Sequence, residues 1–277
     1  MKIVILAGGY ATRLESRTNG GEVAKTLLPI TVEGKTQPIL YFILDKINQI
    51  QTVKDISEII VVTNAKYYNQ IKEACKEWKV NNPRKNGELL FTILNDGSKN
   101  KSEAIGANMD MNLANRYISP NSEEHILVMA SDNYFDFDLD DFLIYGQYKE
   151  IMHGPSNLVV SKVYPDSDRE FIAKNFGILN LGAENHILSL DEKPGIENCK
   201  SNNVSLALYL FNRHDFALLD HYLTLKQDNK KERDSLGYFI NYLVQNTKSF
   251  TFPHHGTFYD IGTPDEYDKL SGMTDNL

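Results

Sequence analysis

The sequence predicts an α/β protein with a mostly parallel central β-sheet that is covered by helices on both faces. Short apolar runs of strand-forming residues alternate along the chain with segments whose apolar residues recur at helical spacing. This alternation is typical of a doubly wound sheet with right-handed crossovers. Loops that carry glycine or carboxylate residues follow several of the runs, and ligands of such sheets bind at the carboxyl ends of the strands.

Length and composition bound the class of protein. The 277 residues are 42% hydrophobic and 24% charged, which is enough to bury the core of one large domain or two small ones. No apolar run approaches the ~20 residues of a membrane span, and Met1-Lys2 leads straight into a strand, so we expect a cytoplasmic protein without a membrane partner. A net charge of −8 argues against nucleic acid as a partner.

The two cysteines, Cys75 and Cys199, are too few for a disulfide framework or a cysteine-type zinc site. The adjacent His254 and His255 would point apart on a strand and have no evident third ligand, so we expect no zinc there either.

The first strand and its loop organise the chain. Residues 2–6 form an apolar run that stops at Ala7, Gly8 and Gly9, and Thr12 and Arg13 follow. Two glycines let backbone N–H groups approach an anion, while the hydroxyl and the guanidinium are suited to phosphate oxygens. The alternative is an ordinary turn with a surface arginine. Lys25 lies at a distance that can fold back as a second cation.

Strands and helices then alternate through the first half of the chain. We expect helices at 39–50 and 65–78, a helix that begins near Ser102, and strands at 58–63, 89–94 and 125–130. The third of the four strands ends at Asn95-Asp96-Gly97 and the fourth at Ser131-Asp132-Asn133. Asp132 is a candidate ligand-binding carboxylate, with an aspartate that caps a turn as the alternative. The acids at 136–141 fit the start of a helix through Tyr148.

The second half is richer in short strands. We expect strands at 158–163, 176–181, 187–190 and 204–211, a hairpin connection at 182–185, and a helix from Asn212 to Leu223. Residues 226–234 are charged and predict a mobile surface loop, after which a helix opens at Ser235. A last strand leads to residues 258–264.

These stretches resemble a known family. Leu-Ala-Gly-Gly-Tyr-Ala-Thr-Arg-Leu at 6–14, followed by Ala-Lys-Thr-Leu-Leu-Pro-Ile at 24–30, resembles the amino-terminal signature of the sugar-1-phosphate nucleotidyltransferases. The likeness is greatest to the glucose-1-phosphate thymidylyltransferase and uridylyltransferase branch, although Ala24 stands where proline is usual. It extends from residue 2 to about residue 270 and implies a three-layer α/β/α, Rossmann-like fold. It also implies one domain over 1–277, with a nucleotide-binding half at 1–150 and a sugar-phosphate-binding half at 151–277.

The resemblance implies the site residues. Arg13, Lys25, Asp132 and Lys193 would be catalytic, and Asp132 and Asp260 would hold Mg²⁺ or Mn²⁺. The nucleotide would lie on Leu6, Ala7, Gly8, Gly9, Thr12, Arg13, Asn95 and Gly97, and the sugar phosphate on Gly177, Glu192 and Lys193. Asp260 stands in an aromatic-x-Asp-x-Gly-Thr-Pro string, and Glu192 in a Glu-Lys-Pro string preceded by Phe176-Gly177.

The implied reaction makes an NDP-sugar and pyrophosphate from a nucleoside triphosphate and a sugar-1-phosphate, with dTTP or UTP and glucose-1-phosphate favoured. One alternative is a metal-dependent glycosyltransferase, which leaves the glycine loop unexplained. The other is a catalytically reduced regulatory paralogue, supported by Glu103, Ser131 and Ala207 where relatives commonly have glycine. Glu103 would either contact the base or be an exposed acid in the first turn of a helix. A homo-oligomer is compatible with the sequence.

Overall fold

The computed structural model describes residues 1–52, 56–84, 88–119 and 122–271. Nine strands form the central sheet: β1 (Lys2–Ala7), β4 (Glu58–Thr63), β5 (Phe91–Asn95), β6 (Ile126–Ala130), β8 (Asn157–Val163), β9 (Gly177–Leu181), β10 (Ile187–Glu192), β11 (Asn203–Phe211) and β12 (Ser249–His254). Two small antiparallel pairs lie outside it: β2 (Pro29–Val32) with β3 (Lys35–Pro38), and β7 (Asn133–Phe135) with β13 (Phe258–Asp260).

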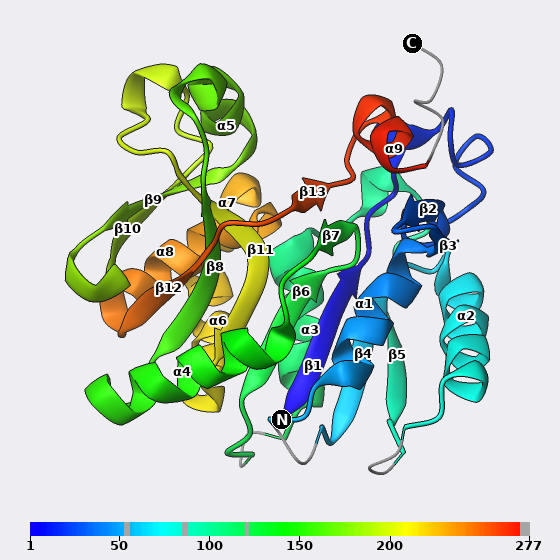
Figure 1. Ribbon diagram of the computed structural model, residues 1–277, viewed down its shortest axis with the longest axis horizontal. Coiled ribbons are helices and arrows are strands. Elements are labelled where there is room, and N and C mark those ends of the chain that lie inside the picture. Colours follow the sequence, from blue (N-terminus) through cyan, green and yellow to red (C-terminus); the bar gives the residue numbers. More distant parts are fainter. Residues whose placement is uncertain (53–55, 85–87, 120–121, 272–277) are drawn as a thin grey trace.

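The sheet runs in the order β10-β9-β11-β6-β1-β4-β5, and β8 joins β11 to β12. β1 is parallel to both of its neighbours, β4 is parallel to β5, and β8 is parallel to β12. The strand β11 runs antiparallel to β6, β8 and β9. The carboxyl ends of β1, β4 and β6 therefore meet at one edge, which is the upper edge in Figure 1. The expected α/β fold with a mostly parallel central sheet is confirmed.

The helices are α1 (Ile39–Gln49), α2 (Tyr68–Asn81), α3 (Ala107–Tyr117), α4 (Leu139–His153), α5 (Arg169–Asn175), α6 (Arg213–Leu225), α7 (Lys230–Asp234), α8 (Leu236–Asn246) and α9 (Pro264–Leu270). Short 3-10 turns lie at Thr12–Leu14, Lys25–Leu27, Lys101–Glu103, Asp166–Asp168, Ala183–Asn185 and Ile196–Asn198. In the described part of the chain, no helix combines the length and apolar character that crossing a bilayer requires.

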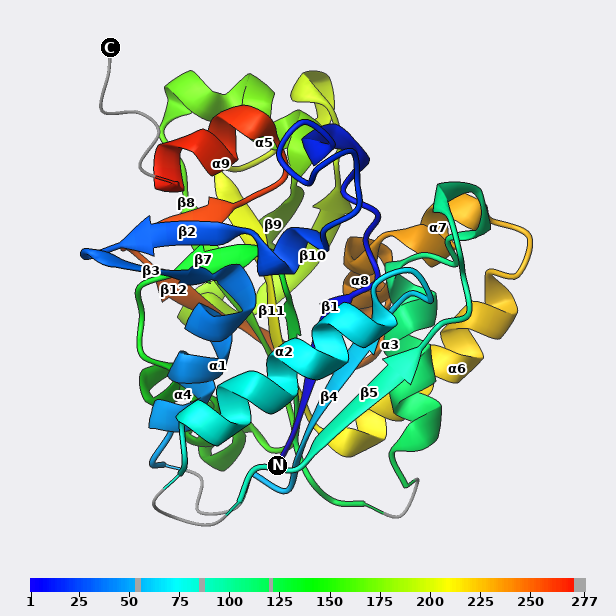
Figure 2. The ribbon, with the colours of Figure 1, turned by 90° about the vertical axis from the view of Figure 1, so that its right-hand side faces the viewer.

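The layers follow from the alternation of side chains along the strands. Ile3 and Ile5 of β1 point to the face covered by α1, α2 and α4, and Val4 and Leu6 point to the face covered by α3, α6 and α8. Figure 2 shows this stacking from the side. Helix α1 packs there because its residues 39, 40, 43, 44 and 47 form one buried face.

A smaller apolar cluster holds the upper edge together. Leu14, from the loop after β1, packs with Ile30 of β2, Ile39 of α1, and Ile261 and Tyr267 near the carboxyl end. Arg17 forms a bidentate ion pair with Asp268 of α9, in which Nε donates to Oδ1 at 2.7 Å and Nη2 donates to Oδ2 at 2.5 Å. The first loop and the last helix, far apart in sequence, are thereby fixed side by side.

Two local expectations are corrected. The helix expected near Ser102 begins at Ala107, because residues 101–103 form a separate 3-10 turn and Gly106 takes a φ of 95°, outside the helical region. The segment 226–234, expected to be a mobile surface loop, contains helix α7. Its Asn229 caps that helix by accepting a hydrogen bond from the backbone N–H of Glu232.

Candidate functional site

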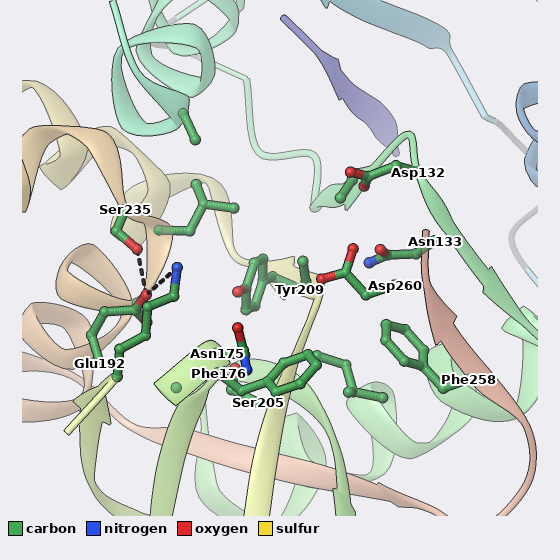
Figure 3. Close-up of a pocket in the computed structure, with 18 of the residues that line it drawn as sticks. Asp132, Asn133, Asn175, Phe176, Glu192, Ser205, Tyr209, Ser235, Phe258 and Asp260 are labelled. Carbon is green, nitrogen blue, oxygen red and sulfur yellow. Dashed lines mark hydrogen bonds and ion pairs between the residues drawn. The ribbon is translucent and has the colours of Figure 1, made fainter. Parts of the chain in front are cut away.

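A pocket of about 250 Å³ opens where the carboxyl end of β6 meets β9, β10, β11 and β13. Figure 3 shows Glu192 and Ser235 on one side, Asp132 and Asp260 on the other, and Tyr209 between them. The lining residues also include Asn175, Phe176, Gly177, Lys193, Ser205, Ala207, Asp234, Gly237 and Phe258. Five residues expected in the site thus line one pocket: Asp132, Gly177, Glu192, Lys193 and Asp260.

The two aspartates come from adjacent strands. Asp132 lies between β6 and β7, and Asp260 ends β13 in register with Asn133 of β7. The backbone N–H of Ile261 donates to the carbonyl of Asp132 at 3.0 Å, which fixes the two segments together. The ammonium of Lys25 contacts Asp132 Oδ2. The structure therefore brings together two carboxylates and a cation that the sequence separates widely.

Burial raises the pKa of Asp260 above its usual value, and the charge of Asp132 raises it further, while Lys25 and Arg13 lower it. A divalent cation between the carboxylates would relieve this cost. In the described parts of the chain, no group of three or more His, Cys, Asp and Glu residues could hold a metal ion. Two carboxylates completed by substrate phosphates and water are the ligand set that Mg²⁺ commonly takes, so these residues fit it.

The glycine loop lies at the same edge of the sheet. Leu6 and Ala7 are buried in β1, and the loop leaves the sheet at Gly8. A Cβ atom on Gly8 would lie 2.3 Å from Asp110 Oδ2, so a side chain cannot be placed there without a shift. At Gly9 the same atom would meet nothing within 4 Å, which leaves its backbone open to a ligand.

Arg13 points from this loop towards the aspartates. Its Nη2 atom lies 2.9 Å from the position that a Cβ on Gly262 would take, and Gly262 follows Asp260 by two residues. Thr12 begins the 3-10 turn that carries Arg13 and is exposed. The structure therefore places Arg13 near Asp260, and both residues were expected in the site.

Asn95 ends β5 and Gly97 lies in the loop that follows, both outside the pocket lining. Asn95 Oδ1 accepts from the N–H of Gly97 at 2.9 Å, and Gly97 adopts a φ of 83°. The loop is joined to the glycine loop by the hydroxyl of Tyr10, which lies 2.8 Å from Ser98 Oγ. Both loops therefore stand at the same edge of the sheet, at the carboxyl ends of β1 and β5, which flank β4.

Glu103 is an exposed residue of the 3-10 turn after this loop. Its carboxylate accepts from the N–H of Lys99 at 2.9 Å and from Asn100 Nδ2 at 2.6 Å. The exposed position and these local bonds agree with the alternative of an exposed acid, but Glu103 ends a 3-10 turn and does not lie in the first turn of a helix.

Glu192 ends β10 and accepts a hydrogen bond from Ser235 Oγ at 2.5 Å. Lys193 follows with a φ of 47°, and its Nζ lies 3.8 Å from Glu192 Oε1. Gly177 faces the same carboxylate, since a Cβ there would be 3.1 Å from Glu192 Oε2.

Several lining residues were not found from the sequence. Tyr209 and Ser205 lie on β11 at an even spacing from Ala207, so the period-two alternation of a strand places all three on one face. Asn175 directly precedes Phe176-Gly177, which was singled out. Asp234 fell in the charged segment that indicated a surface loop, and Ser235 was expected only as the start of a helix.

Three comparisons with known proteins bear on this site. A family model described as "Nucleotidyl transferase" matches residues 2–275. The chain is 26% identical over 264 residues to the bifunctional protein GlmU of Methanocaldococcus jannaschii, covering 95% of this chain and 52% of that protein. It is 28% identical over 149 residues to a glucose-1-phosphate adenylyltransferase of Bacillus cereus, covering 53% of this chain and 36% of that protein. The chain thus spans about half or less of the length of these relatives.

Two solved structures share the fold across nearly all of both chains. One is a protein assigned as a glucose-1-phosphate thymidylyltransferase from Bacillus anthracis, in complex with sucrose, with 19% identity, a TM-score of 0.71, and coverage of 100% of this chain and 96% of that one. The other is a UDP-glucose pyrophosphorylase complexed with UDP-glucose, with 15% identity, a TM-score of 0.74, and coverage of 98% and 97%.

Proposed function

Because this chain belongs to the nucleotidyl transferase family, we propose that it transfers a nucleotidyl group from a nucleoside triphosphate to a sugar-1-phosphate. An oxygen of the sugar phosphate attacks the α-phosphorus, the bond from that phosphorus to the bridging oxygen breaks, and pyrophosphate leaves as the NDP-sugar forms. The observation that carries the proposal is one pocket with Asp132 and Asp260 on one side and Glu192 on the other.

The distribution of charge supports a role for each residue. Arg13, beside Gly262, would stabilise the departing pyrophosphate, and Lys25, beside Asp132, would orient the α-phosphate. Lys193 would hold the phosphate of the sugar, and Glu192 would accept hydrogen bonds from its hydroxyls. Such chemistry needs alignment and charge neutralisation more than a protein nucleophile.

Asp132 and Asp260 would hold Mg²⁺, with Mn²⁺ as a substitute. When bound, such an ion supplies positive charge to the reacting phosphate. The pairing of β7 with β13 would support such a site, because Asp132 directly precedes β7 and Asp260 ends β13.

The nucleotide would lie on the edge formed by Leu6, Ala7, Gly8, Gly9 and Thr12, with its base towards Asn95 and Gly97. This assigns residues 1–150 mainly to the nucleotide and residues 151–277 mainly to the sugar phosphate. We favour dTTP or UTP with glucose-1-phosphate, and the names of the two solved structures with this fold support that choice.

Pyrophosphate release, measured with dTTP, UTP, CTP, GTP and ATP against a panel of sugar-1-phosphates, tests the proposal. We expect metal-dependent release with at least one pair, and mass spectrometry should detect the matching NDP-sugar. Tight nucleotide binding without release for any pair would contradict it and would favour a regulatory paralogue.

A further inference from the structure

We propose that Ser235 is a positioning residue whose hydroxyl holds the Glu192 carboxylate in the orientation that accepts hydrogen bonds from the sugar of the substrate. The inference rests on the proposed function, in which Glu192 binds that sugar. Ser235 lies 43 residues from Glu192 in sequence, at the junction of α7 and α8, and both side chains line the pocket.

The hydroxyl of Ser235 is committed to Glu192. Ser235 is the residue before α8, yet its side chain makes no capping hydrogen bond to that helix, whereas Asn212 and Thr263 do cap α6 and α9. Its Oγ atom donates to Glu192 Oε1 at 2.5 Å instead. The side chain of Ser235, at the N-cap position of α8, therefore bonds to a carboxylate in the pocket and not to the backbone of its own helix.

Two glycines leave the space that this arrangement needs. A Cβ atom on Gly237 would lie 1.9 Å from Glu192 Oε2, and one on Gly177 would lie 3.1 Å from the same oxygen. The Glu192 side chain is only 8% exposed as a result. The carboxylate therefore occupies a narrow slot between β9 and the start of α8, and Ser235 is its hydrogen-bonding partner in that slot.

The backbone of Ser235 is itself held from the other half of the chain. Asn108 of α3 is fully buried, and its Nδ2 donates to the carbonyl of Ser235 at 2.7 Å and to that of Glu232 at 3.0 Å. From α8, Asn241 Oδ1 accepts from the N–H of Leu190 at 3.1 Å, which ties the helix to β10. Ser235 and the strand that carries Glu192 are thus each held by a hydrogen bond to an asparagine of a neighbouring helix.

The ammonium group of Lys193 cannot hold the Glu192 carboxylate in place by itself. Lys193 Nζ is 3.8 Å from Glu192 Oε1, and the lysine side chain is 51% exposed, so solvent screens this ion pair. A hydrogen bond to a nearly buried carboxylate contributes more than an exposed ion pair does. We therefore assign the orientation of Glu192 to Ser235.

Steady-state kinetics on Ser235→Ala and Ser235→Thr tests the inference. Ser235→Ala should raise KM for the sugar-1-phosphate about tenfold, the scale of one hydrogen bond to a charged group, with kcat and the triphosphate KM within about twofold of wild type. Ser235→Thr keeps the hydroxyl and should restore most of the loss. Ser167→Ala is the matched control, because Ser167 Oγ also donates to a carboxylate, that of Asp168, at an exposed site.

A Glu192→Ala background, which removes the acceptor of the Ser235 hydrogen bond, completes the test. There Ser235→Ala should change the sugar-1-phosphate KM by less than about twofold, because the two residues act through one interaction. An unchanged KM in Ser235→Ala, or an equal effect with and without the Glu192 carboxylate, would overturn the inference. Failure of the proposed function is separate, since it would appear as absence of turnover in the wild-type protein.

Discussion

At the scale of single residues, the main electrostatic feature of the pocket is the pair Asp132 and Asp260. Asp132 directly precedes β7 and Asp260 ends β13, the partner strand of β7. Burial, together with the charge of Asp132, raises the pKa of Asp260. Two neighbouring carboxylates repel each other, and a bound cation would offset that repulsion. Glu192 differs, because its partner is a neutral hydroxyl.

We expect Asp132→Asn and Asp260→Asn each to lower kcat at least ~100-fold, the scale of removing one preorganised electrostatic group. Turnover should require Mg²⁺ or Mn²⁺ and should stop in EDTA. Asp141→Asn, at an exposed position in the first turn of α4, is the control and should retain activity. Full turnover in EDTA would exclude a metal role for the pair.

A second buried carboxyl, Asp110, predicts how stability depends on pH. Burial raises its pKa from 3.8 to about 8, with Asp96 and Asp234 adding negative charge. The folded protein keeps a proton that the unfolded chain releases, so the free energy of unfolding should fall as pH rises from about 4 to about 8.

Asp110→Asn removes this titration and should flatten the dependence. Urea denaturation at pH 5 and at pH 8.5 can compare the two proteins, and the variant should be the more stable one at the higher pH. The same slope against pH in both proteins would show that Asp110 is not responsible.

At the scale of elements, the start of α3 is the critical junction. Gly106 has a φ of 95°, and a Cβ there would lie 2.8 Å from the Cα of Asp234 at the end of α7. Neither the left-handed backbone nor the close contact tolerates a side chain. The same junction carries Asn108, which holds Ser235.

Gly106→Ala should therefore destabilise the protein by more than the ~1 kcal/mol that a left-handed alanine alone costs. Gly154→Ala is the matched control, because Gly154 has a φ of 80° but open space around its Cβ position. Thermal unfolding of both variants distinguishes the cost of the positive φ, which both share, from the cost of the steric clash with α7, which only Gly106→Ala has. Equal losses of Tm would mean that the contact with α7 does not matter.

At the scale of the whole molecule, the pocket joins residues from both halves of the chain. Arg13 approaches Asp260 from the first loop, whereas Lys193 lies beside Glu192, on the side of the pocket opposite the aspartates. The two cations should therefore serve different substrates.

Arg13→Ala should weaken triphosphate binding, and Lys193→Ala should weaken sugar-1-phosphate binding with little change for the triphosphate, each by about tenfold for a charge-assisted contact. Titration calorimetry with each ligand alone measures both. Lys174→Ala, an exposed lysine paired with Glu170, is the control. Loss of nucleotide binding in Lys193→Ala, with sugar phosphate binding intact, would reverse the assignment.

The sequence by itself determined the layers and the chemically active strand ends. Apolar runs such as 58–63 can be buried only in a sheet covered on both faces, and the polar residues that follow a strand must appear at its carboxyl end. Asp132, Asp260 and the glycine loop were identifiable for this reason, together with the family signature.

Only the tertiary structure decided which side chains meet across long separations. Asp132 and Asp260 are neighbours because β7 pairs with β13, and that short pair leaves no clear mark in the sequence. Likewise, Ser235 reaches Glu192 because α8 packs on β10 and Gly237 leaves room for the carboxylate. The local periodicity of a sequence indicates which helix or strand a residue belongs to and which face of it is exposed. Contacts between residues of distant elements depend on how those elements pack, and local periodicity does not encode that packing.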